Sequence, residues 1–320
     1  MNNSIGGFFE LELECNKEYY PDYFKFNFAR HAISFYFKNL GINTVWIPTY
    51  ICESIIEALE NDSIRIKFYN INDLINPSLP SQSSKEGLLI VNYFGILNFE
   101  AIPKDLMKKK NVLIDNSQSF FTDYKIFSNA VFSPRKYFGI PDGAYLKTTN
   151  KMLDYNKLTF FKIEEFIKHL ILRIEIGPER AFLNYKKYQE QIKKSEVNKM
   201  SLFSQRVLSS VNYDKIKLKR QNNFLRLKKN LFNYNKLKIG EVISPLCYPL
   251  LIDDGSDLRK ELINNKVFVP QYWPEILSSN KVNKYDLLVS ENLVCLPIDQ
   301  RYGIEEMEKI SRIIYKWMSS

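Results

Sequence analysis

The first half of the chain alternates short apolar runs with amphipathic stretches. Mostly apolar runs indicate buried strands, and apolar residues spaced three and four apart indicate helices. Strands are therefore predicted at residues 44–48, 65–71, 87–95, 111–115, 129–133 and 143–148. Helices are predicted at residues 29–40, 53–60 and 103–110. Such an alternation implies a mostly parallel sheet that helices cover on both faces.

The second half has a different pattern. From about residue 155 to 235 the apolar positions keep a helical period, and Gly177-Pro178 predicts a break between two helices. Further on, strands are predicted at residues 247–252, 266–270 and 292–298, and helices at residues 256–265 and 303–318. Strands and helices mixed in this way indicate a compact α+β unit at the end of the chain.

The chain has 320 residues, which is enough for one large and one small domain. Hydrophobic residues make up 45% and charged residues 25%, as is ordinary for a soluble globular protein with a sizeable core. We therefore predict a large α/β domain at residues 1–235, with three layers around the mostly parallel central sheet. A small α+β domain is predicted at residues 236–320.

The formal net charge of +9 raises the question of an anionic partner. The basic residues are spread along the chain, and in the densest stretch, residues 186–229, they alternate with apolar residues at helical spacing. This spacing is typical of the solvated face of long helices, so we expect no nucleic-acid partner. A basic protein also attracts phosphorylated small molecules, so the charge alone leaves the ligand open.

The cysteines and the N-terminus bear on the compartment. The four cysteines are far apart and form no CxxC pair, and only two histidines are present, so we expect no metal site. The first residues lack the basic start and apolar core of a signal peptide. No apolar run is long enough to cross a membrane. We therefore expect a cytoplasmic protein with reduced thiols.

Four polar residues stand at the ends of neighbouring apolar segments: Asp115, Gln118, Ser133 and Lys136. Ligands of open α/β sheets bind beyond the carboxyl ends of the strands, and Asp115 ends the predicted strand 111–115. Alone, a carboxylate there is more often a helix cap or a solvated loop residue, and a lone lysine is usually just exposed. Together, the four side chains can converge on one planar, anionic cofactor.

Pyridoxal phosphate would use each of these groups. A lysine forms a Schiff base with its aldehyde, and an aspartate pairs with the pyridine nitrogen and keeps it protonated. A glutamine can donate a hydrogen bond to the ring hydroxyl or lie against the ring. A serine and the N–H groups at a helix start can hold the phosphate.

The helix predicted from Ala29 supplies such a start. The N–H groups of Ala29 and Arg30 would face an anion there. The Arg30 side chain either contributes to that site or lies on the surface. His31, followed by apolar residues, is more often a structural histidine than a catalytic one.

The order of several segments resembles the DegT-like (DegT/DnrJ/StrS) family of sugar aminotransferases. The segments are IGGFFELEL, ARHAI, IPTYICESIIEAL, VNYFG, IDNSQSF, VFSPRK, GIPDGAYL, NKMSLFSQRVL and LPIDQRYGIEEMEKI. They span nearly the whole chain. The resemblance implies the fold of type I pyridoxal-phosphate-dependent transferases, with a homodimer whose active site lies at the subunit interface.

The resemblance also implies roles for the central residues. Lys136 would be the Schiff-base lysine and then the acid/base that moves a proton between the substrate carbon and the cofactor. Asp115 would be the partner of the ring nitrogen, and Gln118 the contact of the ring hydroxyl.

By the same resemblance, Ser133 and the amides of Ala29 and Arg30 would hold the phosphate. The chain departs from the family here, because the helix start has Ala-Arg in place of Gly-Thr or Ser-Thr and so lacks a hydroxyl. The serine-to-lysine spacing is also shorter. Cys52 stands about where many relatives have an aromatic residue over the ring, and Tyr50 is the candidate to replace it.

Three functions follow, the first favoured. It is an aminotransferase that moves an amino group, with glutamate as expected donor, to a nucleotide-linked keto-sugar for polysaccharide, lipopolysaccharide or other glycan biosynthesis. The second is a dehydratase-like sugar-modifying enzyme with the same cofactor, which ranks lower because its known forms replace the lysine. The third is a non-catalytic scaffold or regulator, motivated by the altered phosphate site and by the missing segment that, in relatives, reaches the partner subunit's phosphate. It is opposed by the retained Asp115, Gln118 and Lys136.

Overall fold

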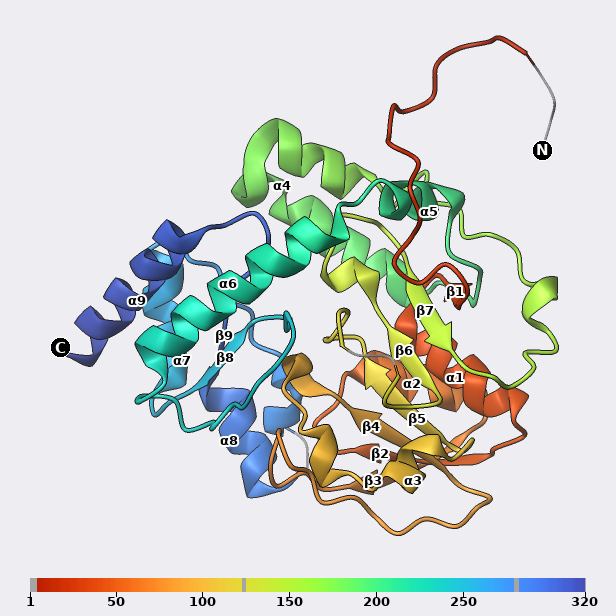
Figure 1. Cartoon of the computed structure of the whole chain (residues 1–320), viewed down its shortest axis with the longest axis horizontal. Helices are drawn as coiled ribbons and strands as arrows, with labels where there is room; N and C mark the ends of the chain where they lie inside the picture. Colours follow the sequence, from red (N-terminus) through yellow and green to blue (C-terminus); the bar gives the residue numbers. More distant parts are fainter. Residues whose placement is uncertain (1–4, 123–124, 279–281, 320) are drawn as a thin grey trace.

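The computed structural model describes residues 5–122, 125–278 and 282–319. A seven-stranded sheet forms its centre, with the strand order β1-β7-β6-β5-β4-β2-β3 (Figure 1). Its strands are β1 (Phe24–Phe26), β2 (Thr44–Pro48), β3 (Arg65–Tyr69), β4 (Gly87–Val91), β5 (Val112–Asn116), β6 (Ala130–Phe132) and β7 (Ala144–Lys147). The pairs among β2 to β6 are parallel, and β7 is antiparallel to both β6 and β1. The predicted mostly parallel sheet is confirmed.

The middle of this sheet is inaccessible to solvent. Every residue of β4, β5 and β6 is buried, as expected for parallel strands covered on both faces. The first residue of β4 shows how closely a helix packs on it. A Cβ on Gly87 would lie 2.7 Å from the Phe37 ring, so only glycine lets that ring reach the strand.

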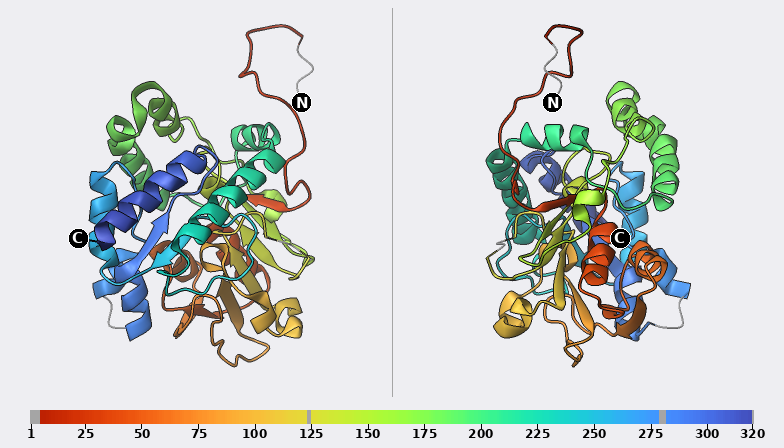
Figure 2. Two further views of the ribbon diagram at one scale, coloured as in Figure 1. Left: turned by 60° about the vertical axis from the view of Figure 1, so that its left-hand side comes forward. Right: turned by 90° about the vertical axis from the view of Figure 1, so that its right-hand side faces the viewer.

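Helices cover both faces of the sheet. Helices α1 (Ala29–Asn39) and α2 (Glu53–Asn61) lie together on one face, and α3 (Lys104–Lys108) lies on the other (Figure 2). Short 3-10 turns connect several elements: η1 (Tyr93–Gly95), η2 (Phe99–Ala101), η3 (Pro134–Lys136), η4 (Tyr155–Lys157) and η5 (Pro274–Ser278). Of these turns, η1 and η3 follow the carboxyl ends of β4 and β6, where the candidate site lies.

The helical middle of the chain holds α4 (Lys168–Lys193), α5 (Leu202–Ser209) and α6 (Tyr213–Leu231). Within α4, Gly177 has φ 79° and ψ 170°, which breaks the helix at the predicted position. Helix α6 leads into the C-terminal part, where it packs against α9 (Figure 1). That part consists of β8 (Tyr248–Leu251), α7 (Gly255–Asn264), α8 (Lys284–Asn292), β9 (Leu293–Leu296) and α9 (Ile304–Met318). Its strands pair antiparallel, and the domain boundary after residue 235 stays a prediction.

Two expected strands were wrong or incomplete, and two elements were missed. The strand expected at residues 266–270 does not form, because the N–H of Val267 bonds to Leu262 O at the end of α7 instead of to another strand. The strand expected at residues 87–95 ends at Val91. Strand β1 and helix α8 were not predicted. In α8 the missed signal is a capping box between Asn283 and Asp286.

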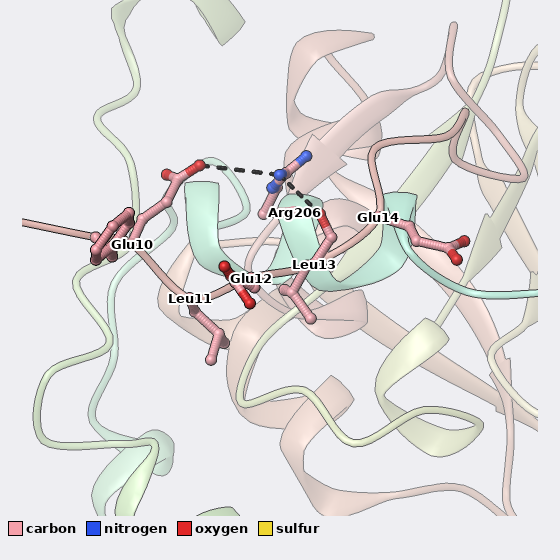
Figure 3. Close-up of a pocket in the computed structure, with 7 residues that line it drawn as sticks. Glu10, Leu11, Glu12, Leu13, Glu14 and Arg206 are labelled. Carbon is pink, nitrogen blue, oxygen red and sulfur yellow. Dashed lines mark hydrogen bonds and ion pairs between the residues drawn. The ribbon is translucent and has the colours of Figure 1, made fainter. Parts of the chain in front are cut away.

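The first described residues, 5–12, are exposed, and this stretch runs away from the body of the molecule (Figure 1). Phe8 and Phe9 are exposed in it. Figure 3 shows the point where it meets α5: Arg206 donates a hydrogen bond of 2.8 Å to Leu13 O and lies 3.8 Å from a Glu10 carboxylate oxygen. Among the described residues, no helix combines the length and apolar character that a membrane span requires.

Candidate active site

Strand β5 carries a buried carboxylate one residue before its carboxyl end, at the centre of the sheet. Asp115 is 5% exposed, and its Oδ1 accepts a hydrogen bond of 2.9 Å from the backbone N–H of Ser117. The ends of β4 and β5 are joined by Asn92, whose Nδ2 donates to Asn116 Oδ1 at 2.9 Å. The carboxylate is therefore held at the strand end where ligands of such sheets bind.

Gln118 follows in the same loop and is 2% exposed. Its Oε1 accepts a hydrogen bond of 2.7 Å from the backbone N–H of Phe94 in η1. Phe94 has φ 54° and Gly95 has φ 84°, so this turn after β4 is left-handed. Because Oε1 is committed to the turn, the direction of the amide Nε2 is fixed.

Three polar atoms of this loop are buried without a hydrogen-bond partner in the part of the chain that the structure describes. They are Asn116 Nδ2, Ser117 Oγ and Gln118 Nε2. A buried polar group left unpaired costs about 1–3 kcal/mol, so such groups are rare in native structures. Three in consecutive residues indicate a place where a polar ligand completes the hydrogen bonding.

Lys136 lies one strand further along the sheet. It ends η3, the turn after β6, and its backbone N–H bonds to Ser133 O at 3.2 Å. Burial among protein atoms lowers the pKa of Lys136, and Arg135 adds to this, whereas Asp115 and Cys52 oppose it. The side chain is nevertheless solvent-accessible. Protein atoms therefore crowd Lys136 while part of the residue stays open to solvent, and we describe such a side chain as recessed.

Tyr137 ties the lysine turn to the rest of the site. Its hydroxyl donates to Gln118 O at 2.9 Å, and its own carbonyl accepts from Gln300 Nε2 at 2.7 Å. The Arg220 guanidinium lies 4.4 Å from the centre of the Tyr137 ring. The loops of Gln118 and Lys136 and the C-terminal part of the chain therefore form one packed unit.

Helix α1 begins beside this unit. Phe28 caps it with extended backbone and without a side-chain hydrogen bond, and its first turn contains no acidic residue. The first N–H groups of a helix, here those of Ala29 and Arg30, have no partner within the helix. His31 bonds to Asn27 Oδ1 at 2.8 Å, and burial lowers its pKa to about 3, so the ring stays neutral and supports the helix start.

The Arg30 guanidinium points inward. It donates to Ser195 Oγ at 2.9 Å and to the Ile192 carbonyl. Burial lowers its pKa to about 10, and the neighbouring Arg135 guanidinium adds to this effect. Arg30 is therefore held against the end of α4 and is not free on the surface, and its role in the site stays a prediction.

Cys52 and Tyr50 have different surroundings. Cys52 is half-buried at the start of α2 and lies close enough to Arg30 and Lys136 to raise the pKa of each. Tyr50 is buried in an aromatic cluster, with its ring centre 4.6 Å from that of Trp273 and 5.5 Å from that of Tyr93. Of the two, only Cys52 is close enough to Lys136 to influence its pKa.

The sequence interpretation missed the support given by Asp142. The Pro-Asp-Gly segment predicts only a tight turn, but Asp142 is fully buried and accepts hydrogen bonds from Ser201 N, Ser201 Oγ and Ser204 Oγ. These bonds hold the start of α5 against the lysine loop. The described residues contain no group of three or more histidine, cysteine or carboxylate side chains that could hold a metal ion.

Comparison with known proteins gives structural matches alone. No family model matches the sequence, and no curated protein does. Several solved structures match most of the chain at low sequence identity. One is NtdA from Bacillus subtilis with bound cofactor PMP, at a TM-score of 0.67 and 15% identity, covering 93% of this chain and 73% of that one.

Two further matches have similar scores. PseC from Helicobacter pylori, an aminotransferase involved in the biosynthesis of pseudoaminic acid, has a TM-score of 0.62 and 16% identity over 91% of this chain and 85% of its own. A DegT DnrJ EryC1 StrS aminotransferase from Brucella abortus has a TM-score of 0.61 and 11% identity over 92% of this chain and 85% of its own. The chain therefore has the fold of the DegT/DnrJ/EryC1/StrS sugar aminotransferases.

Proposed function

We propose that this protein is a pyridoxal-phosphate-dependent aminotransferase that aminates a nucleotide-linked keto-sugar. One observation carries the proposal. The recessed Lys136, the buried Asp115 carboxylate and Gln118 Nε2, which has no partner among the described residues, stand at or just after the carboxyl ends of adjacent parallel strands. These three groups are the ones that pyridoxal phosphate needs at its aldehyde, its ring nitrogen and its ring hydroxyl.

The residues fit the cofactor in their charge and hydrogen bonding. When bound, pyridoxal phosphate supplies an electron sink for the carbon that loses or gains the amino group. Asp115 would pair with the ring nitrogen and keep its proton in place. Gln118 Nε2, which is buried without a partner among the described residues, would donate to the ring hydroxyl.

Lys136 would bond to the cofactor's aldehyde and later carry a proton. The neutral amine is the form that attacks a carbonyl and accepts a proton, and burial lowers the pKa of Lys136 towards that form. Because the side chain remains accessible, Lys136 would be able to take a proton from the substrate carbon and pass it to the cofactor. Ser133 and the N–H groups of Ala29 and Arg30 would hold the phosphate.

The substrate and setting form the finer part of the proposal. Sugar aminotransferases recur among the structures of this fold, which supports a sugar as the amino acceptor. The net charge of +9 suits the phosphates of a nucleotide-linked sugar. Glutamate would be the amino-acid donor and the active form a homodimer. The enzyme would act in the cytoplasm, in the synthesis of lipopolysaccharide or another glycan.

The test is a half-reaction followed by product analysis. Protein loaded with pyridoxal phosphate is mixed with glutamate, and the visible band of the lysine-linked cofactor is expected to convert to that of the amine form. A nucleotide keto-sugar should then restore the first band and yield an amino-sugar. A deoxygenated sugar without net amination would instead favour the dehydratase-like function. A protein that never takes up the cofactor would favour a non-catalytic role.

A further inference from the structure

Two guanidinium groups meet on one aromatic ring at the start of α1. The Cζ of Arg30 lies 4.5 Å from the centre of the Phe28 ring, and the Cζ of Arg135 lies 5.0 Å from it. Phe28 is the residue that caps α1, and Arg135 directly precedes Lys136. Two like charges therefore lie close together beside the start of a helix, and one of them belongs to the residue next to Lys136.

This arrangement lacks a matching negative charge. Neither guanidinium forms an ion pair with a carboxylate of residues 5–122, 125–278 or 282–319. Asp142 is within electrostatic range of Arg135, but its oxygens accept bonds from Ser201 and Ser204, and burial raises its pKa. Partly buried cations that repel one another are costly unless an anion joins them.

Both guanidinium groups are held from one side by residues in and just after the last turns of α4. Arg30 donates to the Ile192 carbonyl and to Ser195 Oγ, and Arg135 donates to the Tyr188 hydroxyl. Tyr188 in turn donates to the Pro141 carbonyl, which fixes its position. The Nε of Arg135 is buried and has no partner among the described residues. The two guanidinium groups are thus fixed in place, and Arg135 Nε remains as a hydrogen-bond donor for a ligand.

We propose that the Arg30 and Arg135 guanidinium groups form a clamp that binds the phosphate of the cofactor at the start of α1. The inference rests on the proposed function and adds to it. Guanidinium groups suit phosphate because their planar donors match its oxygens and their charge offsets its own. They would replace the hydroxyl that the Ala-Arg helix start lacks. The N–H groups of α1 face the same anion and add to the attraction.

The experiment separates the phosphate from the rest of the cofactor. Cofactor-free protein is titrated with pyridoxal phosphate and, separately, with pyridoxal, which has the aldehyde and ring but no phosphate. The wild-type protein, Arg30→Gln, Arg135→Gln and the matched control Arg226→Gln, from an exposed ion pair on α6, are compared. We expect each clamp variant to bind pyridoxal phosphate about tenfold or more weakly, with pyridoxal affinity unchanged. The control should match the wild type.

Equal affinity for pyridoxal phosphate in all four proteins would overturn the clamp and leave the proposed function standing. Parallel losses for both ligands would also overturn it, because the arginines would then act only on the fold. Arg135→Lys and Tyr188→Phe serve where Arg135→Gln does not fold. Arg135→Lys keeps the positive charge but removes the planar guanidinium donors. Tyr188→Phe keeps the guanidinium but removes the hydroxyl that holds it. Each should weaken the binding of pyridoxal phosphate and leave that of pyridoxal unchanged.

If the protein binds neither pyridoxal phosphate nor pyridoxal, the proposed function is refuted. The clamp is then tested with phosphate alone. Inorganic phosphate is then titrated by calorimetry. Binding that is lost in Arg30→Gln and Arg135→Gln would support an anion clamp, and its absence in the wild type would overturn it. Uridine diphosphate is titrated as a separate arm. If Arg135→Gln no longer bound uridine diphosphate but still bound pyridoxal phosphate, the two arginines would bind the nucleotide. The proposal that they bind the cofactor's phosphate would then be wrong.

Discussion

Gln118 Oε1 accepts the backbone N–H of Phe94 at 2.7 Å, and this single contact connects the loop after β5 to the left-handed turn after β4. Because of this contact, the oxygen and the nitrogen of the Gln118 amide have different roles. Its oxygen stabilises the turn, and its nitrogen is left as a buried donor at the proposed position of the cofactor's ring hydroxyl.

Substitutions at Gln118 should separate these two functions. Gln118→Ala is expected to lower the free energy of unfolding by about 1–3 kcal/mol, because the Phe94 N–H loses its buried acceptor. Gln118→Glu keeps an acceptor and removes the donor, so it should cost less stability but weaken pyridoxal phosphate binding about tenfold. Urea unfolding and cofactor titration measure both effects. Wild-type cofactor affinity in Gln118→Glu would contradict the role of Nε2.

The lowered pKa of Lys136 predicts a pH-dependent stability. Between that lowered value and the ordinary 10.5, the unfolded chain binds more protons at this residue than the folded chain does. The stability of the cofactor-free wild type should therefore rise with pH across this window relative to Lys136→Met. Unfolding free energies from neutral pH to about pH 10 test this. A difference between the two proteins that does not change with pH would show that the ammonium is not disfavoured in the fold.

The buried Asp142 carboxylate should contribute more to stability than an exposed loop carboxylate does. Asp142→Ala removes the acceptor of three hydrogen bonds from Ser201 and Ser204, and we expect a loss of about 2–4 kcal/mol. Asp154→Ala is the control, because its ion pair with Lys157 is exposed and should contribute less than about 0.5 kcal/mol. Thermal or urea unfolding distinguishes them. Equal losses of stability in the two variants would show that the hydrogen bonds between Asp142 and the start of α5 contribute little.

The position of Cys52 predicts selective protection by the cofactor. Its thiol is half-buried near Lys136, whereas Cys15 is exposed and Cys247 and Cys295 are buried. Pyridoxal phosphate should slow the alkylation of Cys52 and leave that of Cys15 unchanged, as peptide mass mapping with iodoacetamide would report. Unchanged labelling of Cys52 in the loaded protein would place the cofactor elsewhere.

Much of this site follows from local sequence. The strands that carry Asp115 near their end or stop before Ser133 are short apolar runs, and parallel pairing then brings their carboxyl ends to one edge of the sheet. The start of α1 at Ala29 was likewise predictable, because its apolar positions keep a helical period from there on.

The clamp could not be predicted in this way. Its contacts join residues that lie far apart in the sequence, such as Arg30 with Ser195 and Arg135 with Tyr188, and only the packing of α4 brings them together. The places of the Tyr50 and Cys52 side chains could not be predicted from local sequence either, because the chain turns between β2 and α2. The ring of Trp273, from the C-terminal part, fixes where Tyr50 lies.

The central claim is that Lys136 bonds to pyridoxal phosphate, and one measurement tests it most directly. The protein is incubated with the cofactor and reduced with borohydride, and its peptides are mapped by mass, beside Lys136→Ala and the exposed control Lys104→Ala. We predict a visible band and one modified peptide on Lys136, both lost in Lys136→Ala and retained in Lys104→Ala. A band that persists in Lys136→Ala, or a label on other lysines alone, would contradict the account.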